Sequence, residues 1–138
     1  CGGGREGAAH LTPEQTTMGN AFVHIELNTD DLKGSKKFYT KLFKWKLGEM
    51  PGPYTTINTG KKATGGGMQV KPMPEAPTAW LPYVEVADVK KTIAQAKKLG
   101  ATIALEYQPI PGMGAIGIFI DPAGAALGVW APVKKSKR

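Results

Sequence analysis

The sequence predicts an α+β fold in which two tandem β-α-β-β-β modules form a curved mixed sheet around a cleft. Strand-like and helix-like hydrophobic periods recur in the same order in both halves of the 138-residue chain. The aspartates that can cap the two helices, Asp31 and Asp88, lie 57 residues apart. A sheet that packs one face against its helices can curl the other face around a cavity. We therefore expect one domain with a pocket.

The first module begins with a strand over residues 22–28, because apolar and polar residues alternate there. The apolar side suits the helix, and the polar side faces either the cleft or water. The two sides are Val23, Ile25 and Leu27 against His24, Glu26 and Asn28. A helix capped by Asp30 or Asp31 follows. Its apolar positions are Phe38, Tyr39, Leu42 and Phe43.

Three shorter strands complete the first module, over residues 45–49, 54–58 and 66–71. Turn residues separate them, namely Pro51-Gly52-Pro53 and Gly60. The glycines at 65–67 precede a strand rather than open a helix, which favours a turn or bulge over a phosphate cradle. A proline-rich linker over residues 72–78 then favours an extended connection.

The second module repeats this order. It starts with a strand over residues 81–86, followed by a helix that Asp88 caps and Gly100 ends. The inward positions of this helix are Val89, Ile93, Ala96 and Leu99. The remaining strands are expected over residues 102–107, 115–120 and 126–130.

The ends of the chain differ in composition from its middle. Residues 1–17 lack an apolar period and are interpreted as a flexible leader or tag. Residues 18–133 form the expected domain, with modules over 18–73 and 79–133. Residues 134–138 form a basic tail.

Charge and cysteine content limit the partners and the compartment. The single cysteine, Cys1, can form no internal disulfide, which favours the cytoplasm. Three glycines follow Cys1, as in a mature bacterial lipoprotein, so a lipid anchor at Cys1 is the alternative and otherwise no membrane contact is expected. Much of the net charge of +7 lies in the tail. Because basic residues are not interleaved with aromatics and no recognition helix is predicted, we do not expect nucleic acid as a partner.

Several short segments carry motifs of a known family. They are Phe22 to Asp30 (FVHIELNTD), Phe38-Tyr39, Leu42 to Trp45 (LFKW), Gly65 to Met68 (GGGM), Trp80 to Val84 (WLPYV) and Asp121 to Trp130 (DPAGAALGVW). From Met18 to about Pro132 the chain resembles the vicinal oxygen chelate superfamily, which includes glyoxalase I, bleomycin-resistance proteins and extradiol dioxygenases. It is most similar to small bacterial proteins related to lactoylglutathione lyase. The resemblance implies the glyoxalase/bleomycin-resistance fold, a small-molecule ligand and a homodimer.

In catalytic members of this superfamily, four side chains on the first and last strands of both modules hold a divalent metal. The resemblance places these positions at His24 and Gln69 in the first module and at Pro82 and Gly128 in the second. His24 is a good ligand and Gln69 a weak one, whereas Pro82 and Gly128 have no donor side chain. We therefore expect no cofactor, with a weakly held divalent metal at His24 and Gln69 as the residual option.

Without a metal, glyoxalase I chemistry loses its Lewis acid, so the polar and aromatic side chains carry the function. The inferred inner face holds two catalytic candidates, His24 and Glu26, and three ligand-binding candidates, Gln69, Trp80 and Trp130. Each also has a structural interpretation, since both tryptophans can fill the core and the His24–Glu26 pair can be a structural hydrogen bond.

Two functions remain open from the sequence. The first is a protein that binds a small organic molecule in its cleft without a tightly held metal. The alternative is a lyase or isomerase of the lactoylglutathione lyase type, acting on a small carbonyl compound or thiol conjugate with His24 as the base. The absence of a complete catalytic set favours binding.

Overall fold

A computed structural model describes residues 19–50 and 54–133, and both modules have the predicted order of elements. The first comprises β1 (Phe22–Thr29), α3 (Leu32–Leu42), β2 (Lys46–Glu49), β3 (Thr55–Asn58) and β4 (Gly66–Val70). The second comprises β5 (Ala79–Glu85), α4 (Val89–Lys98), β6 (Thr102–Ile110), β7 (Gly114–Ile120) and β8 (Ala126–Pro132). The predicted leader, the Pro51-Gly52-Pro53 turn and the basic tail lie outside the described residues.

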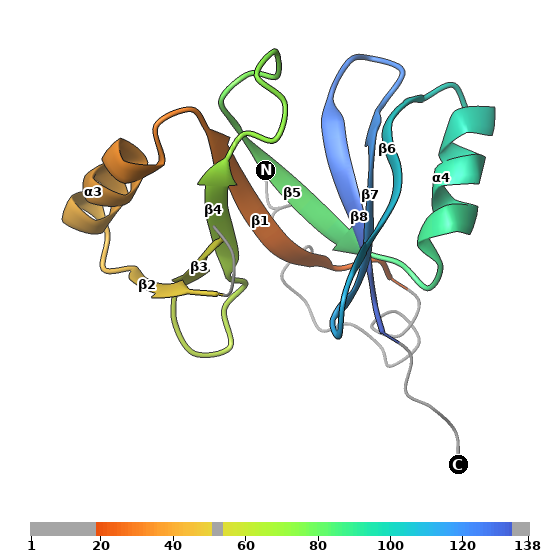
Figure 1. Cartoon of the computed structure of the whole chain (residues 1–138). Helices are drawn as coiled ribbons and strands as arrows, with labels where there is room; N and C mark the ends of the chain where they lie inside the picture. Colours follow the sequence, from red (N-terminus) through yellow and green to blue (C-terminus); the bar gives the residue numbers. More distant parts are fainter. Residues whose placement is uncertain (1–18, 51–53, 134–138) are drawn as a thin grey trace, which may run out of the picture.

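The strands form one eight-stranded mixed sheet in the order β2-β3-β4-β1-β5-β8-β7-β6. Within each module the first strand pairs in parallel with the last, β1 with β4 and β5 with β8. The modules join through antiparallel pairing of β1 with β5, so both halves of the sheet come from the same chain. Figure 1 shows this sheet curving, with α3 and α4 on its outer side at opposite ends. The curved mixed sheet is thus confirmed.

Both helices begin where the sequence predicts, and α4 ends at the predicted stop. Asp31 rather than Asp30 caps α3, because its Oδ1 accepts a hydrogen bond of 3.0 Å from the Gly34 amide. The Asp88 Oδ1 atom caps α4 in the same way, at 3.1 Å from the Lys91 amide. Gly100 follows α4 with a φ of +105°, a conformation that glycine adopts without strain.

The core is divided into one apolar cluster per module. Buried Val89 and Ile93 of α4 pack with Val86, Ala115 and Val129 in the second module. In the first module, the cluster is made of Leu27, Ile57 and Met68, with partly buried side chains packed around it. Each cluster lies between the sheet and its helix, which leaves the other sheet face free to form a site.

The two helices differ in how well they are covered, and here the prediction was partly wrong. Helix α3 has no buried residue, and Phe38 and Leu42 are 58% and 57% exposed although the apolar period placed them inward. Leu99, at the end of α4, was also expected to face inward and is 72% exposed. Helical spacing identifies an apolar face, but the sheet must be wide enough beneath it to cover that face.

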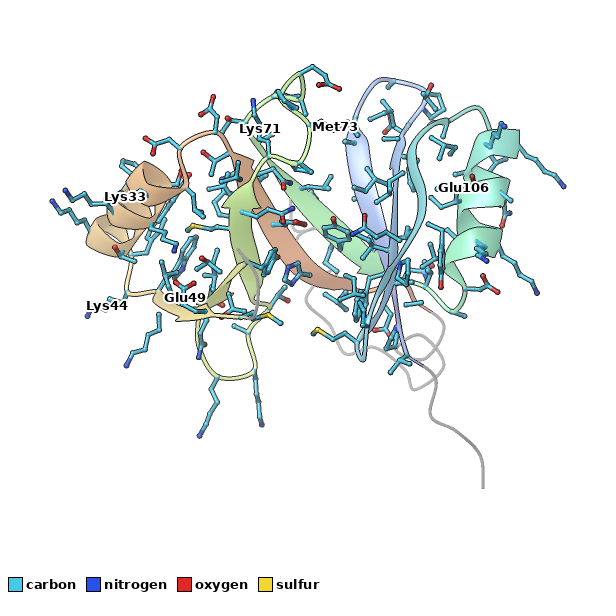
Figure 2. The ribbon with its side chains drawn as sticks, viewed as in Figure 1. Lys33, Lys44, Glu49, Lys71, Met73 and Glu106 are labelled. Atoms are coloured by element: carbon cyan, nitrogen blue, oxygen red, sulfur yellow. The ribbon has the colours of Figure 1, made fainter. Side chains whose placement is uncertain are left out.

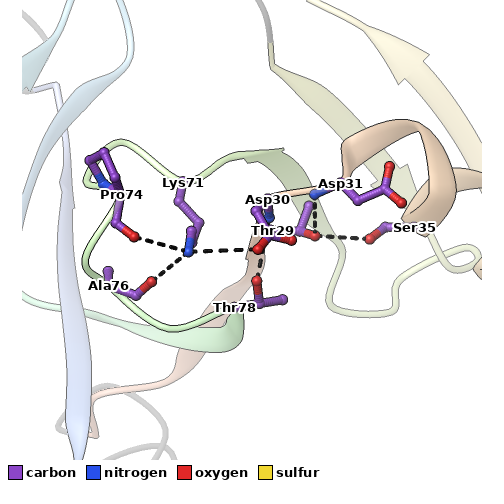
Figure 3. A network of polar contacts seen from close by, with 8 residues as sticks. All are labelled: Thr29, Asp30, Asp31, Ser35, Lys71, Pro74, Ala76 and Thr78. Atoms are coloured by element: carbon purple, nitrogen blue, oxygen red, sulfur yellow. Dashed lines mark hydrogen bonds and ion pairs between the residues drawn. The ribbon is translucent and has the colours of Figure 1, made fainter.

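The proline-rich connection between the modules is held against the end of β1 (Figure 3). The Lys71 ammonium donates hydrogen bonds to the carbonyls of Pro74 and Ala76, at 3.2 and 2.7 Å, and lies 4.0 Å from the Asp30 carboxylate. The Thr78 hydroxyl accepts from the Asp30 amide at 3.3 Å. These contacts tie the connection to the residue that follows β1, just before β5 starts.

None of the helices in the described ranges is both long and apolar enough to cross a bilayer.

Candidate functional site

A cavity of about 520 Å³ lies on the sheet face opposite the helices. Both modules contribute to its wall, so it forms only when β1 and β5 pair. Its polar lining consists chiefly of His24, Glu26, Tyr54 and Gln69 from the first module and Tyr83 and Gln108 from the second. The pocket predicted from the sequence is therefore present, and three of the five candidate residues lie on its polar wall.

Glu26 is the centre of a hydrogen-bond network on this wall. Its side chain is only 6% exposed. Its Oε1 atom accepts from the Tyr83 hydroxyl at 3.0 Å, and its Oε2 atom accepts from Gln69 Nε2 at 2.9 Å. Gln69 Nε2 also donates to Asn28 Oδ1 at 2.9 Å. The network joins β1, β4 and β5 across the module boundary.

His24 has a different partner from the one the sequence favoured. Its Nε2 atom is hydrogen-bonded to the Tyr54 hydroxyl at 2.7 Å, and the Tyr83 ring lies edge-on to it with centroids 5.9 Å apart. Among the described residues no hydrogen bond joins His24 to Glu26. The two side chains share the cavity face, but they belong to separate contacts.

Burial shifts the pKa values of the titratable side chains that line the cavity. Desolvation lowers the pKa of the His24 imidazole, which favours its neutral form. Desolvation raises the pKa of the Glu26 carboxyl, and the hydrogen bond from Tyr83 partly opposes that rise. Burial, together with the nearby Glu26 carboxylate, raises the pKa of Tyr54 and Tyr83. At neutral pH both tyrosines therefore stay protonated and can donate hydrogen bonds.

The second-module positions implied for a metal do not fit one. Pro82 was assigned to the cavity face, but it pairs with Ile25 on the helix side of the sheet, and Tyr83 takes the cavity side. Gly128 does lie on the cavity side, opposite Tyr83 in the register. A Cβ atom at Gly128 would lie 2.5 Å from the Tyr83 ring, which fills that space.

The side chains of the first module that could bind a metal do not replace the ligands that the second module lacks. His24 is hydrogen-bonded to Tyr54, and both oxygens of Glu26 accept hydrogen bonds. Within residues 19–50 and 54–133, no three His, Cys, Asp or Glu side chains are grouped so that they could hold an ion. The donor set therefore does not match the metal site that the fold family implies.

The two tryptophan candidates lie on opposite faces of the sheet. Trp130 lines the cavity. Trp80 does not, because it pairs with Leu27 on the helix side. There its indole Nε1 donates to the Tyr39 hydroxyl at 3.3 Å, and its ring meets Trp45 edge-on. Its placement on the inner face followed from assigning Pro82 to that face, an error of one residue that reverses the side of every residue in β5.

Several lining residues were not predicted. Tyr54, Tyr83 and Met113 are the main ones. Tyr83 could have been found from the correct parity of β5. Tyr54 depends on Gly67, because a Cβ atom at Gly67 would overlap the Tyr54 ring, and nothing in the local sequence predicts that contact. The glycines at 66 and 67 thus lie inside β4 and permit close approach rather than forming a turn.

Val23 also lines the cavity, although alternation placed it on the helix side. The register between β1 and β5 shifts between Phe22 and His24. A shift of this kind redirects the side chains beside it, so the simple alternation fails at the start of the strand.

Comparison with known proteins shows curated relatives of this chain. It is 29% identical over 116 residues to "Putative glyoxylase CFP32" of Mycobacterium bovis, covering 77% of this chain and 43% of that protein. It is 26% identical over 126 residues to "Anthracycline biosynthesis protein DnrV" of Streptomyces peucetius, covering 77% of this chain and 45% of that protein. The chain thus spans less than half the length of the curated relatives it matches.

The fold is shared with solved structures at low sequence identity. Methylmalonyl-CoA epimerase from Mycobacterium tuberculosis superposes with a TM-score of 0.61 at 11% identity, covering 82% of this chain and 88% of that one. At this identity the likeness concerns the fold alone. Residues 21–129 match the sequence pattern of a family that shares this architecture. The chain therefore belongs to the Glyoxalase/Bleomycin resistance protein/Dioxygenase superfamily.

Proposed function

We propose that the chain binds a small organic molecule in the cavity between its modules, without a tightly held metal. The observation that carries this proposal is the cavity itself, whose volume of about 520 Å³ is in the size range of small-molecule sites. One wall is polar, with Glu26, Gln69 and Tyr83, and the other wall is apolar around Trp130 and Ile116. Such a combination orients a ligand through a few polar groups and holds it by apolar contact.

The names of the curated relatives agree with a small-molecule role. One is named a glyoxylase and the other an anthracycline biosynthesis protein. Both names refer to the chemistry of small organic molecules rather than to nucleic acids or protein partners. They support the class of ligand but do not select one.

A thermal-shift screen with small aromatic and thiol-conjugate compounds tests the proposal. A ligand that binds the folded chain raises its melting temperature. Trp130→Ala should abolish that shift, because Trp130 lines the cavity. Trp80→Ala is the matched control, since Trp80 lies on the other sheet face, and it should retain the shift. Equal shifts in both variants, or no shift in the wild-type chain, would contradict binding in this cavity.

The proposed lack of a tightly held metal has a separate test. The support is the mismatch of the donor set, above all the Tyr83 ring beside Gly128. Calorimetric titration with Zn²⁺ and Mn²⁺ should show no binding, or weak binding that His24→Ala removes. A stoichiometric ion in the purified protein would overturn this part of the proposal.

The second candidate function is an isomerase or lyase step with His24 as general base. The observation that favours it is the partly buried His24 imidazole on the cavity wall, whose lowered pKa keeps it neutral and able to accept a proton. Tyr54, at 2.7 Å, would orient the ring, in the place where the sequence favoured Glu26 or Gln69. On any confirmed substrate, unchanged turnover in His24→Ala would exclude this function.

We further propose that the chain forms a homodimer through an apolar patch, the α3 face, made of Phe38 and Leu42 of α3 and Phe43 just after it. These three side chains are 58%, 57% and 44% exposed. Each curated relative has more than half of its length outside the matched part, enough for a second unit of this size. In this chain, a second copy would take the place of that second unit. The two copies would then bury the same apolar face on both sides of the interface.

Sedimentation at micromolar concentration tests the dimer. The wild-type chain should sediment as a dimer, and Leu42→Glu should sediment as a monomer. Leu99→Glu is the control, because Leu99 is 72% exposed on the other module and should leave the dimer intact. A wild-type monomer would contradict the proposal.

For the compartment we propose the cytoplasm, supported by the single cysteine in the sequence. The intact mass of protein from the native host tests the compartment, because an acylated Cys1 would indicate a lipid anchor instead.

We also propose that the domain spans residues 18–133, with modules over 18–73 and 79–133.

A further inference from the structure

The cavity differs in charge from the rest of the chain. The sequence has 18 lysines and arginines against 11 aspartates and glutamates. Yet no lysine or arginine in the described ranges lines the cavity, and Glu26 is the only carboxylate there. Figure 2 shows the charged side chains of Lys33 and Lys44 at the α3 end and Glu106 at the α4 end, away from the module boundary. The cavity is thus an acidic site in a basic protein.

Glu26 has hydrogen-bond donors but no cationic partner among the described residues. Its donors are the neutral groups of Tyr83 and Gln69. The ion pairs of the described chain involve other residues, Lys36 with Glu49 and Lys71 with Asp30. When it is ionised, a buried carboxylate without a cation carries an unbalanced charge at low local dielectric, where an opposite charge is attracted more strongly than in water.

The carboxylate also has room for a further donor. A carboxylate presents about four acceptor positions on its two oxygens. Here each oxygen accepts one described hydrogen bond, one from Tyr83 and one from Gln69. An N–H group that enters from the cavity can therefore bond to Glu26 without displacing either partner.

The apolar side of the cavity favours an aromatic ring system in the ligand. It includes Ile110, Met113, Ile116 and Trp130 from the second module. Methionine sulfur and tryptophan both make favourable contacts with aromatic rings, and the two isoleucines add apolar surface. An anionic ligand, in contrast, would lose its hydration beside Glu26 and gain no cation in return.

From this arrangement, and resting on the proposed function, we propose that the cavity selects a ligand with an aromatic body and a protonated amine, whose ammonium bonds to Glu26. The ring lies against Trp130 and the methionine-containing wall. The Glu26 carboxylate, held by Tyr83 and Gln69, determines specificity for the charge of the ligand.

Three indole compounds of similar size test the proposal by calorimetry on the full chain at neutral pH: tryptamine, tryptophol and indole-3-acetate. They carry a cation, a neutral hydroxyl and an anion. We expect tryptamine to bind at least about tenfold more tightly than tryptophol, as charge-assisted hydrogen bonds allow. Indole-3-acetate should bind most weakly. Equal affinities, or tightest binding of the acid, would overturn the proposal while leaving small-molecule binding intact.

The Glu26→Gln variant assigns the effect to the carboxylate. It should reduce tryptamine affinity about tenfold and leave tryptophol affinity unchanged within about twofold. Glu106→Gln, an exposed residue of β6, is the matched control and should change neither affinity. If Glu26→Gln does not fold, the order of the three affinities in the wild-type chain still decides. Failure of all three compounds to bind would count against the proposed function as well.

Discussion

The Tyr83 hydroxyl donates a hydrogen bond of 3.0 Å to the Glu26 carboxylate across the boundary between the modules. Both side chains are buried, at 4% and 6% exposure. One residue belongs to β5 and the other to β1, so the contact exists only when the two modules pair. It links the stability of the module boundary to the geometry of the cavity.

Removing this hydroxyl should destabilise the chain. Tyr83→Phe keeps the ring beside Gly128 but leaves one Glu26 oxygen without its donor. We expect a loss of about 1–3 kcal/mol in the free energy of unfolding, measured by urea denaturation at neutral pH. Tyr107→Phe, at an exposed position, should change it by less than about 0.5 kcal/mol. A loss in Tyr107→Phe as large as in Tyr83→Phe would contradict the assignment.

Glu26→Gln should change the pH dependence of stability. Because burial raises the folded-state pKa of Glu26 above its ordinary value of 4.5, the folded chain holds this proton more tightly than the unfolded chain. The cost of ionising Glu26 is therefore absent below pH 4.5 and grows as the pH rises through the folded-state pKa. The difference in unfolding free energy, variant minus wild type, should rise with pH above 4.5 and then level off. A difference independent of pH would show that Glu26 is not desolvated.

His24 should titrate below its ordinary range. Burial lowers its pKa from 6.5, so its contribution to stability is fully present above pH 6.5 and decreases as the pH falls below that value. Proton NMR measures the titration of the His24 imidazole. The sequence has one other histidine, His10, so His24→Gln assigns the His24 signal by removing it. A His24 midpoint at or above 6.5 would contradict the burial of the ring.

The unequal burial of apolar residues along α4 predicts unequal costs of truncation. Ile93 of α4 is 2% exposed, so Ile93→Ala should cost about 2–5 kcal/mol in the free energy of unfolding. Leu99, just after the same helix, is 72% exposed, and Leu99→Ala should cost less than about 0.5 kcal/mol. Thermal or urea unfolding of both variants measures this difference. Similar losses would contradict the position of the helix on the sheet.

Much of the fold could be predicted because local rules determine it. Asp31 and Asp88 cap helices where their sequence positions indicate, and Gly100 ends α4 with a positive φ. The alternation in β1 placed His24 and Glu26 on one face correctly. These features depend on neighbours in the sequence, so the sequence alone is sufficient to predict them.

The errors come from contacts between distant segments. The parity of β5 depends on its pairing with β1, so assigning Pro82 to the cavity also misplaced Trp80 and missed Tyr83. The partner of His24 depends on the space beside Gly67, which only the packed sheet reveals. Packing across the sheet, rather than local pattern, therefore decides which polar groups meet in the cavity.

The most direct test of the cavity as the binding site is NMR mapping of bound tryptamine on the full chain. We predict that amide shifts concentrate around Glu26 and Gln69 in the first module and around Ile116 and Trp130 in the second, because these residues line one cavity. The α3 face of Phe38, Leu42 and Phe43 should show no comparable change. Shifts confined to that face, or spread without preference over the surface, would contradict a binding site between the modules.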